Sequence, residues 1–133
     1  LSAGVGSRYA DRLGPGVVFG GIALGLVFQA FVAGALTDAL AWLGLPMRIA
    51  VTAALIAPVG FLMGIPFPKG ALRVGPLVDW GCAVNGAASV LGGTAVLLVA
   101  FNAGFAAALS LAAALYLVAG GLLAAPSAWI LRS

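Results

Sequence analysis

Long runs of hydrophobic residues fill almost the whole chain, and polar residues are confined to short gaps between them. Four runs, at about residues 16–36, 49–65, 80–101 and 105–125, are long enough for a transmembrane helix. Crossing a hydrocarbon core of about 30 Å takes about 20 helical residues. No run alternates polar and apolar residues as a membrane β-strand does. Because backbone groups in lipid must be paired within the segment, each run predicts a helix.

Composition leads to the same class. The 133 residues include six basic and three acidic ones, and 64% are hydrophobic. A water-soluble domain of this size needs far more charged surface. The sequence therefore predicts an all-α, polytopic membrane protein with four transmembrane helices in a compact bundle, forming a single domain over residues 1–133.

Basic residues are distributed unequally between the gaps, which predicts an orientation. Alternate gaps lie on the same side of a membrane, and one side carries Arg48 alone. The positive-inside rule places the opposite, basic side in the cytoplasm, with both chain ends there, and we expect the cell inner (plasma) membrane. The short gap 102–104 predicts a tight turn. The expected anchors to anionic headgroups are Arg8, Arg12, Lys69, Arg73 and Arg132.

The start of the chain differs from that of a complete multi-pass protein. Residues 1–15 read as the end of a preceding helix followed by a cytoplasmic loop. We therefore expect a piece of a larger protein or a truncated reading frame. Its expected partners are the lipid bilayer and further helices or a soluble domain of the parent. No basic patch with interleaved aromatic residues accompanies the net charge of +3, so no nucleic-acid partner is expected.

Small residues recur four positions apart within the runs, a spacing that lets helix backbones approach closely. Such stripes serve as sliding surfaces in transporters, but ordinary close packing is the commoner role, and we favour it. Pro58 lies inside the second run and is expected to kink it and free a carbonyl. The residues expected in helix packing are Gly20, Gly25, Gly60, Gly64 and Gly92.

Three uncharged polar residues lie within the runs: Gln29, Asn85 and Ser89. Asn85 and Ser89 are four residues apart and share one helix face. They are candidates either for lining a path for a polar solute or for hydrogen-bonding helices together, and we favour the second. No charged residue lies near mid-membrane, which argues against a proton relay.

Residues for catalysis or metal binding are lacking in this sequence. Without His there is no Ser-His-Asp or Cys-His pair, and Cys82 is the single cysteine. We therefore predict no catalytic, cofactor-binding or metal-binding residue and no cofactor.

Two segments carry a family resemblance. They are GIPFPKG at 64–70 and WGCAVNGAASVLGG at 80–93, followed by the 102–105 turn and a last helix containing Tyr116. Together they resemble the C-terminal membrane region of multi-pass spermidine synthase-like proteins. This resemblance implies an integral-membrane domain, non-catalytic on its own, that anchors or assists a polyamine-related aminopropyltransferase-like domain of Rossmann type. That soluble domain is not encoded in these residues, and no catalytic residue carries over.

A second resemblance keeps a transporter open as the alternative. Residues 7–14, SRYADRLG, are similar to the cytoplasmic loop motif of the major facilitator superfamily, a small residue followed by x-x-x-Asp-Arg-x-Gly. Ser7 replaces its first glycine, and Pro15-Gly16 replaces the basic residues that usually follow. This resemblance implies a fragment of a transporter for a small polar solute.

Overall fold

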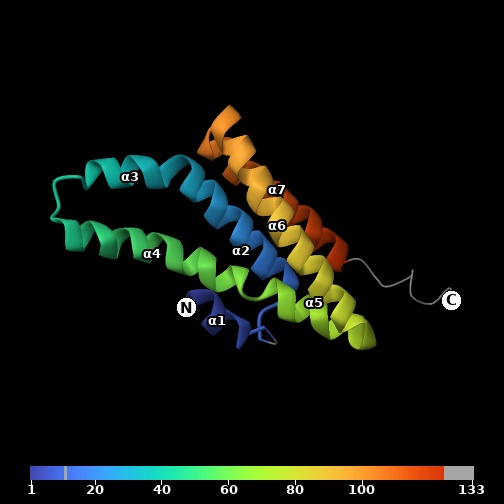
Figure 1. Ribbon diagram of the computed structural model, residues 1–133. Coiled ribbons are helices and arrows are strands. Elements are labelled where there is room, and N and C mark those ends of the chain that lie inside the picture. The colour runs from blue at the N-terminus through green and yellow to red at the C-terminus, as the bar shows by residue number, and fades with distance from the viewer. Residues whose placement is uncertain (11, 125–133) are drawn as a thin grey trace.

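The structure, a computed structural model, describes residues 1–10 and 12–124, and within these ranges every regular element is helical (Figure 1). The predicted all-α class is confirmed. The elements are α1 (Ser2–Ser7), α2 (Pro15–Phe28), a π-helix (Gln29–Ala33), α3 (Gly34–Ala39), α4 (Leu45–Met63), α5 (Pro66–Val74), a 3₁₀ turn (Gly75–Leu77), α6 (Val78–Ala103) and α7 (Phe105–Ala124).

Four helical stretches are long and apolar enough to cross a membrane, as predicted. The first three extend past the hydrophobic runs because the helices continue into the polar flanks. The predicted end of the last run, Ala125, lies outside the described residues. The stretches are Pro15–Ala39, Leu45–Leu72, Gly75–Ala103 and Phe105–Ala124.

Proline and glycine set several of the helix ends. Pro15 and Pro46 stand in the first turns of α2 and α4, where a missing N–H breaks no intrahelical bond. Gly104 joins α6 to α7 with φ +87°, a conformation that glycine adopts without steric cost. This is the tight turn expected at 102–104.

Helix α2 lies at the centre of the bundle. It packs most extensively on α7 and also on α4, and α6 packs on α7. The short α1 packs against the second half of α4. The buried core is therefore built mainly from α2 and consists of Val18, Phe19, Ile22, Ala23 and Leu26, with Ala10, Val59, Ile65 and Ala113 around them.

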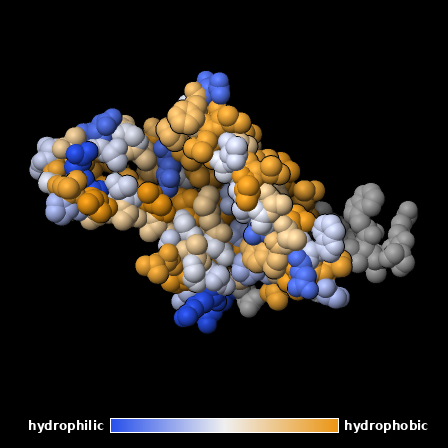
Figure 2. Space-filling model, in the orientation of Figure 1, coloured by the Kyte–Doolittle hydropathy of each residue, from blue (hydrophilic) through white to orange (hydrophobic). Residues whose placement is uncertain are grey.

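Much of the outer surface is apolar. No residue of α6 is buried, and α3 with the first half of α4 forms a hairpin that projects from the bundle (Figure 1). Hydrophobic residues cover much of the visible face between the more hydrophilic ends (Figure 2). In water this exterior would be unfavourable, whereas in lipid it faces a solvent of its own polarity.

Candidate functional site

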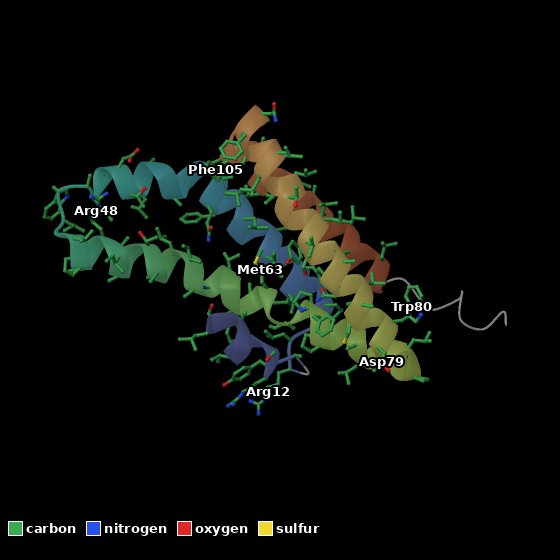
Figure 3. The ribbon with its side chains drawn as sticks, in the orientation of Figure 1. Arg12, Arg48, Met63, Asp79, Trp80 and Phe105 are labelled. Atoms are coloured by element: carbon green, nitrogen blue, oxygen red, sulfur yellow. The ribbon has the colours of Figure 1, made fainter. Side chains whose placement is uncertain are left out.

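Most of the basic residues lie in two places, between α1 and α2 and on α5, and both places lie at one end of the bundle. Arg12 and Asp79 lie at this end, whereas Arg48 lies at the tip of the projecting hairpin and Phe105 at another distant tip (Figure 3). We call the end of the bundle with Arg12 and Asp79 the basic end. Arg8 and Arg12 are exposed and Lys69 is half-buried on α5. Arg73 is also on α5, and Arg132 lies outside the described residues.

Aromatic contacts hold Tyr9, which lies between α1 and α2, against α4. The guanidinium carbon of Arg12 lies 5.7 Å from the centre of the Tyr9 ring. The Tyr9 ring in turn lies 5.8 Å from that of Phe61, at an interplanar angle of 49°. A cation over an aromatic face is attracted by the ring quadrupole. Tyr9 therefore contacts both Arg12 and the end of α4.

Glycines allow the crossing of α1 and α4. A Cβ at Gly64 would overlap the carbonyl oxygen of Ala3, and one at Gly6 would overlap that of Phe61. A Cβ at Gly60 would lie 2.6 Å from the hydroxyl oxygen of Ser2. Backbone atoms cannot move aside as the Ser2 side chain can, so the two helices approach this closely only with glycine at positions 6 and 64.

The other predicted packing glycines divide into two groups. A Cβ at Gly25 would lie 2.5 Å from Cγ2 of Val59, so Gly25 lies at the contact between α2 and α4. A Cβ at Gly20 or Gly92 would meet no atom within 4 Å. Among the described residues, these last two positions make no close helix contact.

Gln29 joins α2 to α4 beside the proline. Its side-chain amide donates a hydrogen bond to the carbonyl oxygen of Leu55, with 3.2 Å between the heavy atoms. Leu55 follows Ala54, whose carbonyl loses its helical donor because Pro58 has no N–H. Gln29 also begins the π-helix, a distortion frequent at functional positions. The sequence predicted a polar Gln29 and a freed carbonyl separately. The hydrogen bond of Gln29 goes to the Leu55 carbonyl, one residue after the carbonyl that Pro58 frees.

The other two polar candidates are arranged differently. The Ser89 hydroxyl donates to the carbonyl oxygen of Asn85 at 2.7 Å, so its bond stays within α6. Among the described residues, the Asn85 amide forms no hydrogen bond to another helix; it lines a cavity. Hydrogen bonds between helices were favoured for all three polar residues. Among the described residues, Gln29 forms one, and Asn85 and Ser89 do not.

This cavity, at the basic end, is the candidate functional site. It has a volume of about 490 Å³ and is only partly enclosed. Four helices and the end of α4 surround it. Its lining consists of Phe19, Met63, Pro66, Phe67, Gly70, Ala71, Val78, Gly81, Asn85, Tyr116, Ala119 and Leu123.

The lining is aromatic and aliphatic with two polar side chains. Asn85 supplies an amide and Tyr116 a hydroxyl, and the Tyr116 ring lies 6.3 Å from that of Phe19. Among the side chains that the structure describes, none that lines the cavity is charged. The described lining can bind an apolar group and hydrogen-bond one polar group, but it offers no counter-charge to a cation. Among the described residues, no cluster of His, Cys, Asp or Glu suits a metal ion.

Sequence reasoning had singled out only Asn85 among the cavity residues as a site candidate. Among the other lining residues, Pro66, Phe67, Gly70 and Tyr116 belong to the segments of the family resemblance, and α5 lies in a gap for which no helix was predicted. The sequence did contain one signal for helix α5. In Pro66–Val74, Lys69 and Arg73 are four residues apart and share one helix face, while Phe67 lies on the other face.

Comparisons with known proteins add no relative. No protein family, curated protein or solved structure matches the chain.

Proposed function

We propose that this chain is the integral-membrane domain of a spermidine synthase-like protein, non-catalytic on its own. In this proposal it lies in the cell inner (plasma) membrane with both ends cytoplasmic, and it anchors or assists an aminopropyltransferase-like domain. The observation that carries the proposal is that residues from each of the segments with the family resemblance line one cavity.

These segments are far apart in the sequence. Pro66, Phe67 and Gly70 come from the first, and Asn85 comes from the second. Tyr116 comes from the last helix. If the segments resembled this family only in local hydrophobic composition, there would be no reason for their residues, on three different helices, to surround one cavity. The cavity also lies at the end of the bundle that the positive-inside rule assigns to the cytoplasm, where a soluble domain would be attached.

The parent gene provides the direct test. Its sequence on either side of residues 1–133 is expected to encode a Rossmann-type domain with the strand–loop–helix phosphate site of that fold. Deleting residues 1–133 from the parent should move that domain from the membrane fraction to the soluble fraction while aminopropyl transfer persists. Aminopropyl transfer by the 133-residue chain alone would contradict the proposal.

A transporter fragment is the competing proposal, and one observation favours it. In the facilitator-like segment, Arg12 lies over the Tyr9 ring and Tyr9 contacts Phe61 of α4, while Asp11 lies outside the described residues. Two further blocks of apolar helices in the parent, with no Rossmann-type domain, would support the transporter instead.

A further inference from the structure

Both helices of the projecting hairpin are interrupted at the same level. In the first, the π-helix at Gln29–Ala33 separates α2 from α3. In the second, Pro58 lies inside α4 and leaves the Ala54 carbonyl without its usual helical donor. The hydrogen bond from the Gln29 amide to the Leu55 carbonyl joins the two helices at this level. Prolines and π-bulges are the usual sites of bending in long helices.

Burial also changes at this level. Leu26 and Val59 belong to the core, whereas none of the residues 27–58, all of which the structure describes, is buried. The bundle side of the interruptions is held by the packing of α2 on α7 and α4. We call residues 34–54 the hairpin arm, and this arm projects from the bundle (Figure 1). A segment with few buried contacts can move at a low cost in free energy.

The hairpin arm is packed within itself. Helix α3 packs on α4, and Thr37 lies across a small space of about 50 Å³ from Arg48 and Thr52. Bending at the two interruptions therefore moves α3 and the first half of α4 together and does not separate them.

A groove beside Pro58 leaves room for this bending. On the bundle side of the proline, α2 and α4 are in close contact, since a Cβ at Gly25 would lie 2.5 Å from Cγ2 of Val59. Between the same helices lies a partly open groove of about 450 Å³. Its lining towards the hairpin arm includes Leu24, Phe28, Ala54 and Leu55. Side-chain packing therefore leaves α4 free to change its angle to α2 here.

We infer that the π-helix and the turn of α4 around Pro58 form a hinge, about which the hairpin arm changes its angle to the bundle. Bending of the arm towards α2 narrows the groove, and bending away widens it. The hydrogen bond between Gln29 and the Leu55 carbonyl acts as the pivot, because it joins the two helices where neither has a complete set of α-helical bonds. This hinge does not depend on the relationship to spermidine synthase-like proteins.

The experiment is double electron–electron resonance on the 133-residue chain in lipid nanodiscs, in a Cys82→Ser background that removes the single cysteine. One pair of spin labels joins the arm to the bundle, at the exposed positions Ile49 of α4 and Leu115 of α7. A reference pair lies within the bundle, at the exposed positions Val17 of α2 and Leu115. The distance distribution of the arm pair is expected to be about twice as broad as that of the reference pair.

Matched proline variants assign this breadth to the hinge. Pro58→Ala restores the N–H that bonds to the Ala54 carbonyl, so it should narrow the arm distribution towards that of the reference pair. Pro46→Ala is the control and should leave the breadth unchanged, because Pro46 stands in the first turn of α4, where a missing N–H breaks no intrahelical bond. Pro58→Leu restores the same N–H and replaces Pro58→Ala if that variant does not fold.

Three results would overturn the hinge. The first is an arm distribution in the wild type that is as narrow as the reference distribution. The second is unchanged breadth in the folded Pro58 variants. The third is equal narrowing by Pro46→Ala, which would place the motion at the start of α4 and not at Pro58.

Discussion

Replacing Gln29 with Leu tests the junction between α2 and α4. The variant keeps an apolar stem of similar length but removes the donor to the Leu55 carbonyl. Hydrogen bonds between membrane helices contribute roughly 0.6 kcal/mol on average and reach about 2. The separation of 3.2 Å between the two heavy atoms is at the long end of the usual N–H···O range. We therefore expect the free energy of unfolding to fall by about 1 kcal/mol.

The assay is reversible unfolding in mixed detergent micelles, with Ser89→Ala as the matched control. The Ser89 hydroxyl bonds within its own helix, so its loss should change the free energy of unfolding by less than about 0.5 kcal/mol. Equal stability of Gln29→Leu and the wild type would refute the role assigned to this bond.

Three further predictions address packing, orientation and the cavity. Gly64→Leu should destabilise the chain by about 1–3 kcal/mol, because its Cβ overlaps the Ala3 backbone, whereas Gly92→Leu should leave the unfolding free energy nearly unchanged. In a Cys82→Ser background, single cysteines at 69 and 38 should react with an impermeant thiol reagent from opposite membrane sides; labelling from one side would contradict the topology. Asn85→Leu should keep the unfolding free energy within about 0.5 kcal/mol of the wild type, since its amide bonds to no other helix among the described residues; a larger loss would show a packing role.

The helices could be predicted because lipid imposes a strong constraint on sequence. A segment that buries about 20 residues in hydrocarbon must be apolar and internally hydrogen-bonded, and both properties are visible along the chain. The turn at Gly104 was equally visible, because the gap between two runs was only three residues long. Helix α5 was missed for the opposite reason. It is short and half polar, so its apolar face is not a continuous run.

The packing partners were much harder to predict. Small-residue spacing marks a surface that can be approached, but not which helix approaches it. Gly60 and Gly64 contact α1, Gly25 contacts α4, and a Cβ at Gly92 would meet no atom of another helix within 4 Å, although all four lie in similar patterns. The pattern is a property of one helix, whereas the contact depends on the positions of two.

The contrast between Gln29 and Asn85 shows how the same limit affects function. Each is an uncharged amide within an apolar helix, and the sequence gives both the same interpretation. Gln29 lies against α4, and its amide is used in a hydrogen bond to the Leu55 carbonyl that holds the two helices together. Asn85 faces the space between α5, α6 and α7, so its amide remains available to a molecule in the cavity. A polar residue in a membrane helix therefore becomes a candidate for function when the packed neighbours leave its hydrogen bonds unused, which only the arrangement of the other helices determines.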